Sequence, residues 1–289
     1  MAGILNGEII SADSRQIYSG MDIGTAKVSN LHRSIVRHHM LDILRPDQSF
    51  SVHDYYLRAL ECVTDILSRS KTPILVGGSG EYVSCLTQGL LTASVPSDPC
   101  VRDRLLGELR SNGLESLFSR LAELDPERAQ TIDSNNPHRV IRALEIIEVS
   151  GMRIARPSRQ RAPTDAITLG IQLSPEERRR NIDRRTDEMF RDGLVDEVRC
   201  LMALGYRNNS VLERSIGYSQ VCDYLVGQIS LRDCVQKIKV ATNGYAKRQS
   251  TWFRNQGGVV WVRKSEIMAH EMIRRAMLHI QGETTYDTD

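Results

Sequence analysis

Acidic and hydroxyl side chains follow directly after a short apolar run near the start of the chain. The run EIISA, residues 8–12, predicts a buried strand, and it leads into SADSRQIYSGMDIGTAK. In open parallel sheets, functional groups gather beyond the carboxyl ends of the strands, so Asp13, Ser14 and Gln16 lie where a site is expected. A simpler interpretation makes Asp13 an N-cap of the next turn, with Ser14 as its hydrogen-bonding neighbour. This segment alone does not decide between the two.

A glycine-rich turn, LVGGSGEY, closes a second apolar run. Residues 73–78 predict a strand, and the glycines after it would let the backbone approach a ligand closely. The amide groups at the start of a following helix favour anions. The competing interpretation is a tight strand-to-helix turn that needs a positive φ angle.

Basic and aromatic residues alternate in a third segment, KIKVATNGYAKRQSTWFRNQGG. Here Lys247 and Arg248 stand close to Tyr245, Trp252 and Phe253. Cations beside flat rings suit a phosphate backbone and unstacked bases, which predicts contact with RNA. A charged helix with one aromatic stripe in the core is the alternative.

Two further segments carry arginines at helical positions. In NNPHRVIRALEII, Arg139 and Arg142 share one helix face, and Val140, Leu144 and Ile147 supply the opposing apolar stripe. In LERSIGYSQVCDYL an arginine precedes a Gly-Tyr step. Neither segment is diagnostic by itself.

Two polar groups are interpreted as ordinary. His38 and His39 are adjacent and point apart, and no third ligand stands at a useful spacing, so no metal site is predicted. The segment RRRNIDRR, residues 178–185, is interpreted as a solvated helix face that adds to the electrostatic attraction for RNA.

Short apolar runs alternate with longer amphipathic ones, which is typical of an α/β protein with a mostly parallel sheet. Helices are expected over 54–70, after the cap-like Ser51, and over 176–190, and further strands over 166–173 and 258–263. The pattern is helical throughout 98–151, which predicts a helical insertion into the α/β core. The predicted divisions are core residues 1–97, a helical insertion at 98–160, the rest of the core with RNA-contacting helices at 161–280, and a tail at 281–289.

The composition fits an ordered globular protein, with 40% hydrophobic and 26% charged residues and a net charge of +2. Such a net charge neither requires nor excludes nucleic acid. The six cysteines include no CxxC pair and are expected to be reduced thiols. We expect a cytoplasmic protein without a membrane span, because no apolar run approaches about 18 residues.

Taken together and in this order, ISADSRQIYSGMDIGTAK, LVGGSGEY, PHRVIRALE, ERSIGYSQ and YAKRQSTWFR resemble the tRNA dimethylallyltransferases, from about residue 7 to residue 263. The resemblance implies an α/β core like that of P-loop kinases with a helical insertion, and a channel that dimethylallyl diphosphate and the target adenine enter from opposite ends. It further implies transfer of a dimethylallyl (isopentenyl) group to N6 of the adenosine at tRNA position 37, next to the anticodon, in tRNAs that read codons beginning with U.

The resemblance also implies roles for residues at matching positions. Asp13 matches the general base that accepts a proton from the adenine N6 amine. Ser79 and Arg102 match flanking substrate contacts. The implied tRNA-contacting residues are Asp13, Ser14, Arg15, Gln16, His138, Arg139, Val140, Ile141, Arg142, Arg214, Ser215, Ile216, Gly217, Tyr218, Ser219, Lys247, Arg248, Gln249, Ser250, Thr251, Trp252, Phe253 and Arg254.

The implied partners are the anticodon stem-loop of tRNA and dimethylallyl diphosphate, with Mg²⁺ bound to the diphosphate as cofactor. The expected oligomeric state is a monomer. Three other functions stay open: an adenylate isopentenyltransferase that uses free nucleotide, a catalytically dead tRNA-binding protein, and a small-molecule kinase or NTPase.

The family opens with a strand and a phosphate-binding GxTxxGK[ST] loop, and the sequence contains no such motif. We expect the first strand and the P-loop to be absent because the chain is a fragment or starts at an internal Met; real loss of the loop is the alternative. We also expect the chain as given to be poorly active. Smaller departures from the family pattern are Asn243 and Gly244, His138 and the GGSGEY turn.

Overall fold

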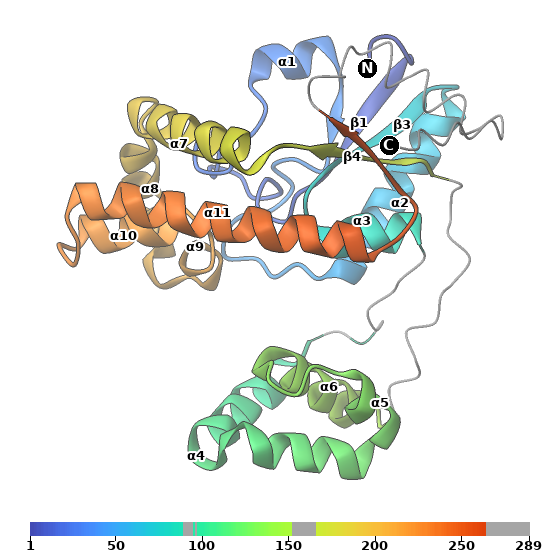
Figure 1. The fold of residues 1–289 in the computed structure, drawn as a ribbon, viewed down its shortest axis with the longest axis vertical. Helices are drawn as coiled ribbons and strands as arrows, with labels where there is room; N and C mark the ends of the chain where they lie inside the picture. Colours follow the sequence, from blue (N-terminus) through green and yellow to red (C-terminus); the bar gives the residue numbers. More distant parts are fainter. Residues whose placement is uncertain (89–94, 96, 152–165, 264–289) are drawn as a thin grey trace.

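The computed structural model describes residues 1–88, 95, 97–151 and 166–263 (Figure 1). Within these ranges the strands form two parallel sheets. The first contains β1 (Gly7–Ala12), β2 (His38–His39) and β3 (Thr72–Gly77) in the order β2-β1-β3, and the second pairs β4 (Thr168–Gln172) with β5 (Val259–Arg263). The predicted mixed α/β fold with a parallel sheet is confirmed.

The carboxyl ends of β1 and β3 coincide. Their register runs from Gly7 opposite Thr72 to Ala12 opposite Gly77. The residues that follow the two strands, Asp13 and Gly78, therefore emerge side by side at one edge of the sheet.

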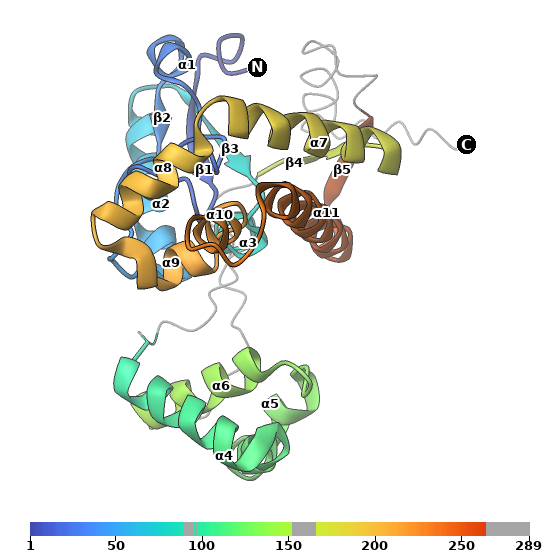
Figure 2. The same cartoon turned by 90° about the vertical axis from the view of Figure 1, so that its left-hand side faces the viewer.

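Helices α2 (Val52–Ser68) and α3 (Gly80–Thr87) pack against this sheet (Figure 2). A capping box starts α2, because the Ser51 hydroxyl accepts from the Asp54 N–H and the Asp54 carboxylate accepts from the Ser51 N–H. The core between helix and sheet includes Ile10 of β1 and a stacked pair of rings, Tyr55 and Tyr82, with centroids 3.8 Å apart. The short helix α1 (Asn30–Ile35) buries none of its residues.

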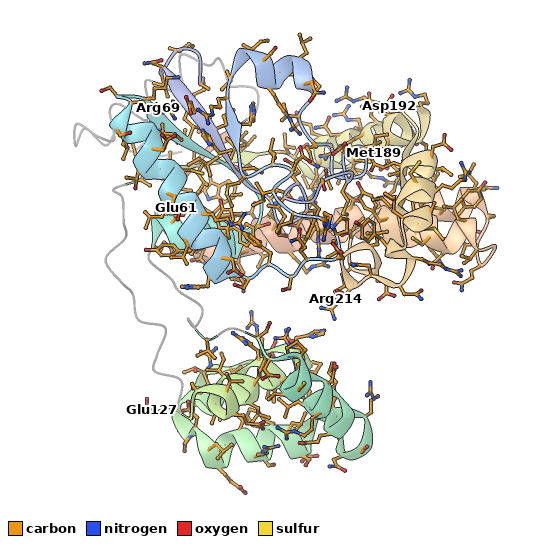
Figure 3. All side chains as sticks on the ribbon, turned by 180° about the vertical axis from the view of Figure 1, so that it is seen from behind. Glu61, Arg69, Glu127, Met189, Asp192 and Arg214 are labelled. Atoms are coloured by element: carbon orange, nitrogen blue, oxygen red, sulfur yellow. The ribbon has the colours of Figure 1, made fainter. Side chains whose placement is uncertain are left out.

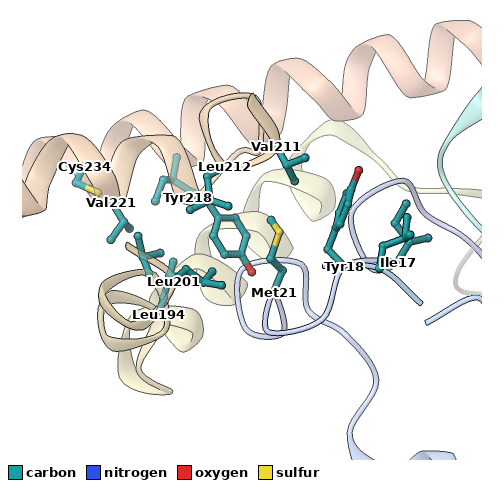
Figure 4. Packing of buried hydrophobic residues seen from close by; sticks show 13 residues of the cluster. Ile17, Tyr18, Met21, Leu194, Leu201, Val211, Leu212, Tyr218, Val221 and Cys234 are labelled. Atoms are coloured by element: carbon teal, nitrogen blue, oxygen red, sulfur yellow. The ribbon is translucent and has the colours of Figure 1, made fainter. Parts of the chain in front are cut away.

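A second apolar cluster joins the segment after β1 to the helices of the C-terminal half. These elements are α7 (Pro175–Arg191), α8 (Leu194–Ala203), the 3-10 helix η1 (Tyr206–Asn208), α9 (Ser210–Glu213), α10 (Tyr218–Leu225) and α11 (Leu231–Asn255). Figure 4 shows Met21 of the segment and Tyr218 of α10 within this cluster, together with Leu194 and Leu201 of α8. Packing thus fixes residues 17–21 against helices that lie about 180 residues later in the chain.

The helices α4 (Pro99–Leu124), α5 (Pro126–Thr131) and α6 (Pro137–Ser150) share a core of their own, which includes Leu105, Leu117, Leu121 and Leu144. Figure 1 shows them grouped apart from the sheets. The predicted helical region is not continuous, because Gly113 has a φ of 78° and breaks the regular helix inside α4.

The predicted strands over residues 8–12, 73–78, 166–173 and 258–263 are confirmed with small shifts at their ends. The helix predicted over 176–190 is α7, and Ser174 starts it with a capping box. The predicted tail at 281–289 lies outside the described residues. No helix in the described ranges is both long and apolar enough to cross a membrane.

Candidate active site

Asp13 lies just beyond the carboxyl end of β1. One of its carboxylate oxygens accepts backbone hydrogen bonds, and the other accepts none from the described residues. Oδ1 accepts from the backbone N–H groups of Arg15 at 2.8 Å and of Gln16 at 3.3 Å. This is the capping turn expected from the simpler interpretation of the segment. Within the described part of the chain, Oδ2 has no hydrogen-bond partner, and Asp13 is only half-buried. A carboxylate held this way is oriented by its backbone and still has an acceptor to offer.

Hydrogen bonds connect the turn after β3 to the residues around Asp13. The Ser14 N–H donates to the Ser79 hydroxyl at 3.0 Å, and the Ser79 N–H donates to the Ala12 carbonyl at 3.0 Å. Ser79, predicted as a substrate contact, therefore lies directly beside the Asp13 segment. Its hydroxyl oxygen accepts a backbone bond and keeps its proton to donate.

The glycines of this turn are required by crowding. The prediction of a positive φ angle is wrong, because the turn glycines are not among the residues with positive φ. Instead, a Cβ added at Gly77 would lie 2.2 Å from the Ala12 carbonyl oxygen, and one at Gly78 would lie 1.7 Å from Nε2 of Gln249. A Cβ on Gly80 would lie 2.2 Å from Nε1 of Trp252.

Helix α11 lies over the turn and contributes two kinds of side chain. Gln249 donates from Nε2 to the Gly78 carbonyl at 2.9 Å. Trp252 packs on Gly80, and its buried indole N–H has no hydrogen-bond partner among the residues that the structure describes. Lys247, Arg248 and Arg254 are exposed. The predicted RNA-contacting segment 247–254 thus combines residues that dock the helix with cations that face solvent, so both interpretations of the segment hold in part.

The charge of Asp13 acts on two further residues. Partial desolvation raises the pKa of the Tyr245 hydroxyl, and the negative charge of Asp13 raises it further. Desolvation lowers the pKa of Arg185 on α7, and the same carboxylate opposes that shift. Nη2 of Arg185 also donates to the Thr25 carbonyl at 3.2 Å, and Nε2 of Gln16 donates to the same oxygen at 3.1 Å.

Arg185 is the site residue that the sequence prediction missed. It falls in the segment interpreted as a solvated helix face, and nothing in its local spacing distinguishes it from the neighbouring arginines. The structure separates them. Arg184 forms an i,i+4 pair with Glu188, whereas Arg185, although also exposed, donates to the Thr25 carbonyl and is influenced by the charge of Asp13.

The segment 214–219 is divided between the surface and the core. Arg214 is exposed, and Figure 3 shows it at the opposite end of the core from Arg69. The side chains of Ser215 and Tyr218 are buried, with the Ser215 hydroxyl bonded to the Val211 carbonyl. If this segment contacts RNA as predicted, the contact falls to the neighbours of these two side chains.

The predicted residues of the insertion surround a buried carboxylate. Glu145 of α6 is fully buried, and it accepts from Arg102 at 2.6 Å, from Arg142 at 2.8 Å and from the Asp98 N–H at 2.9 Å. Arg102, predicted to contact substrate, already has this structural partner. Nη2 of Arg142 donates to the Val95 carbonyl as well.

The start of α6 presents its remaining polar side chains outward. His138 and Arg139 are exposed, whereas the side chains of Val140 and Ile141 are buried in the insertion core and give RNA no side-chain surface. Desolvation raises the pKa of Glu81 at the start of α3, and the charge of Arg139 opposes that shift. The charge of Arg139 thus acts on the exposed Glu81 at the start of α3.

The described residues do not supply a magnesium site by themselves. Among them, no group of three or more His, Cys, Asp or Glu side chains could hold a metal ion. Magnesium at phosphate sites is commonly held by one or two carboxylates together with phosphate oxygens. A magnesium ion here would have to share its coordination with a bound diphosphate. His38 and His39 form β2, where His39 pairs with Glu8.

Comparison with known proteins gives a consistent result. The family model described as IPP transferase matches residues 16–256. The chain is 37% identical over 285 residues to the tRNA dimethylallyltransferase of Oceanobacillus iheyensis, covering 98% of this chain and 91% of that protein. It is 41% identical over 266 residues to the tRNA dimethylallyltransferase of Geobacter metallireducens, covering 91% of this chain and 86% of that protein.

Solved structures give the same picture. The crystal structure of the full-length tRNA isopentenylpyrophosphate transferase from Bacillus halodurans matches with a TM-score of 0.69 and 36% identity, over 98% of this chain and 91% of that one. A eukaryotic dimethylallyltransferase captured in crystallographic snapshots acting on tRNA matches with a TM-score of 0.78 and 25% identity, over 99% of this chain and 76% of that one.

Proposed function

Because the chain belongs to the IPP transferase family, we propose that it transfers a dimethylallyl group to tRNA, with dimethylallyl diphosphate as donor and N6 of the adenosine next to the anticodon as acceptor. The observation that carries the proposal is the open oxygen of Asp13 at the edge of the sheet where the turn after β3 and helix α11 meet. Each of these segments comes from a different part of the chain. Their meeting at one carboxylate supports a catalytic site.

In the proposed step, the adenine N6 nitrogen attacks the allylic carbon of the donor. A C–N bond forms, the C–O bond to diphosphate breaks, and diphosphate leaves with the electron pair. Oδ2 of Asp13 accepts the proton that N6 loses. An exocyclic amine is a weak nucleophile, so the orientation of the carboxylate by the N–H groups of Arg15 and Gln16 contributes by fixing the acceptor in place. Arg185 supplies positive charge beside the site, and magnesium would neutralise the departing diphosphate.

The tRNA would lie across the exposed cations on both sides of this edge. Lys247, Arg248 and Arg254 of α11 and Arg139 of α6 offer charge to phosphates. The target adenine must leave the stack of the loop to reach Asp13, and Tyr245, which is 42% exposed and close to that carboxylate, offers a flat ring at the entrance. We place the reaction in the cytoplasm and assign it to a monomer; six free thiols agree with a reducing compartment.

The test uses two proteins, because the sequence contains no GxTxxGK[ST] motif. One is the chain as given, and the other carries the phosphate-loop segment of a relative before residue 1. Each is incubated with dimethylallyl diphosphate, magnesium and either an anticodon stem-loop or free adenylate, and the products are identified by mass spectrometry.

We expect the protein with the loop to prenylate the stem-loop and to leave free adenylate unmodified, and the chain as given to be poorly active. Modification of free adenylate would favour the alternative of an adenylate isopentenyltransferase. Stem-loop binding without transfer by either protein would favour a tRNA-binding protein, and transfer of a phosphoryl group would indicate a kinase.

A further inference from the structure

A carboxylate on α8 holds the loop that carries the Thr25 carbonyl. Oε2 of Glu197 accepts from the N–H groups of Asp22 at 3.0 Å and Ile23 at 2.8 Å, and Oε1 accepts from the Gly24 N–H at 3.3 Å. The phenol of Tyr218 donates to Oε1 at 2.6 Å. Four donors thus converge on one side chain that is more than 170 residues away from the loop. Hydrogen bonds to an ionised carboxylate are among the stronger ones in proteins.

The loop is a compact turn with its own internal support. The Lys27 N–H donates to the Asp22 carbonyl at 2.9 Å, and the buried Lys27 ammonium contacts the carboxylates of Asp22 and Asp42, each at 2.6 Å. The Tyr218 ring packs on Gly24 of the turn, so closely that a Cβ added at Gly24 would lie 2.5 Å from the ring. These contacts hold the turn together, and Glu197 accepts hydrogen bonds from its first three N–H groups.

The other end of the turn contacts two side chains, one from the segment after β1 and one from α7. The Thr25 carbonyl accepts from Nε2 of Gln16 at 3.1 Å and from Nη2 of Arg185 at 3.2 Å. The backbone N–H of Gln16 belongs to the capping turn of Asp13, and the charge of Asp13 raises the pKa of Arg185 against the effect of desolvation. One bonded path thus runs from Glu197 through the turn to the two groups beside the proposed general base.

We infer that Glu197 is a positioning residue for the transfer reaction: by holding the turn 22–25, it sets the Thr25 carbonyl that aims Arg185 and Gln16 at the Asp13 site. The inference rests on the proposed function. It assigns no contact with substrate to Glu197. Nothing in the sequence motifs pointed to this residue, because its partners are distant in the chain.

The test compares Glu197→Gln and Tyr218→Phe with two controls on α8. Gln offers an N–H₂ group to N–H donors that need an acceptor, so the turn should loosen, and Phe removes one of the four donors. Asp196→Asn changes an exposed neighbour that pairs with Arg199. Val198→Ala weakens the same apolar cluster and leaves every hydrogen bond to the turn in place, and thus controls for lost stability.

The first readout is amide hydrogen exchange over residues 22–25, measured without substrate. We expect Glu197→Gln to speed exchange there by about tenfold or more, because three charge-assisted bonds are disrupted. Tyr218→Phe should have a smaller effect and both controls none. Unchanged exchange in Glu197→Gln would overturn the inference, whether or not transfer is observed.

The second readout separates positioning from folding. In the form of the protein that is active, Glu197→Gln should lower kcat by about 10- to 100-fold with the Kd for tRNA nearly unchanged, since a small misplacement of catalytic groups is enough. In an Arg185→Ala background the same substitution should lower kcat by a smaller factor, because only the Gln16 contact with the Thr25 carbonyl remains to be lost. The inference would be overturned if Glu197→Gln and Val198→Ala had the same kcat at matched folded fraction. It would also be overturned if Glu197→Gln lowered kcat by the same factor with and without Arg185. Absence of transfer in the parent protein would instead contradict the proposed function, and the exchange data would still decide the role of Glu197 in the turn.

Discussion

Strand β1 carries a carboxylate near each end, and the two have opposite surroundings. Glu8, at the beginning, is 2% exposed and accepts from Arg69, from Lys71 at 2.8 Å and from His39 at 2.7 Å. Asp13, just past the end, is half-buried and accepts two backbone N–H bonds on a single oxygen. Five residues thus separate an acid whose acceptors are all in use from one that keeps an acceptor open.

The difference shows that partners, more than residue type, decide what a carboxylate can do. The hydrogen bonds from Arg69 hold the pKa of Glu8 well below its usual range, and those from Lys71 and His39 add to this effect against the opposing effect of burial. All the acceptor positions of Glu8 are therefore taken by fixed cations and His39. Asp13 lies beside the turn and helix that the family resemblance singles out, and its Oδ2 accepts no hydrogen bond from the described residues.

The largest effect is expected from Asp13→Asn. The amide oxygen can still accept the N–H groups of Arg15 and Gln16, so the turn should persist while the proton acceptor is lost. We expect kcat to fall by about 10²- to 10⁴-fold, the range typical of general-base catalysis. Single-turnover prenylation of the stem-loop measures it.

Asp47→Asn is the matched control, because Asp47 is exposed and pairs only with Arg45 among the described residues. Its rate should equal that of the parent protein. A near-normal transfer rate in Asp13→Asn would show that Asp13 is not the general base. Glu8 and Asp13 would then not differ in their contribution to catalysis.

Glu8→Gln should act on stability and leave the chemistry alone. The substitution would leave the charges of Arg69 and Lys71 without their buried partner. Because both cationic side chains are about one third exposed, the loss of unfolding free energy is smaller than for a fully buried ion pair. We expect unfolding free energy to fall by about 2–3 kcal/mol, measured by denaturant unfolding.

Glu61→Gln on the exposed face of α2 is the control, with an expected change within about 0.5 kcal/mol. Figure 3 shows Glu61 on α2 and Arg69 at the end of the same helix, on one side of the core. The kcat per folded molecule of Glu8→Gln should match the parent value. A catalytic defect there would mean that the two ends of β1 are not independent.

A pH series sharpens the same comparison. Since the folded-state pKa of Glu8 is depressed, its contribution to stability is present above the ordinary glutamate pKa of about 4.3 and is lost as pH falls toward the folded-state value. The stability difference between the parent and Glu8→Gln should therefore be constant near neutrality and should narrow below about pH 4.3. A difference that stays constant down to pH 2 would contradict the assignment.

The elements of the fold were largely predictable because local signals decide them. Ser51 and Ser174 each start a helix with the capping box that sequence favours, and the apolar runs become β1, β3, β4 and β5. Strand β2 was missed, since two residues carry no periodicity. Its place beside β1 depends on a pairing that only the tertiary structure creates.

The site was predictable only in part, for a related reason. Motifs mark segments, and a segment mixes residues that face the site with residues that hold it in place. Ser215 and Tyr218 are of the second kind, as their burial shows. Arg185 and Glu197 were missed because their partners, Thr25 and the N–H groups of residues 22–24, lie more than 150 residues earlier in the chain.

The smallest effects concern two glycines, one at the Asp13 end of the sheet and one in the insertion. In Gly80→Ala the new methyl group would meet the rigid Trp252 ring, which should shift α11 away from the turn and cost about 1–2 kcal/mol of stability, with lower kcat. A Cβ at Gly107 of α4 would meet nothing within 4 Å, so Gly107→Ala should stabilise the helix by about 0.5–1 kcal/mol, as alanine usually does in a helix. Thermal unfolding followed by tryptophan fluorescence and by circular dichroism measures both. If Gly80→Ala were as harmless as Gly107→Ala, α11 would not be held on the turn by Trp252, and the close approach of helix and turn would not be what requires glycine there.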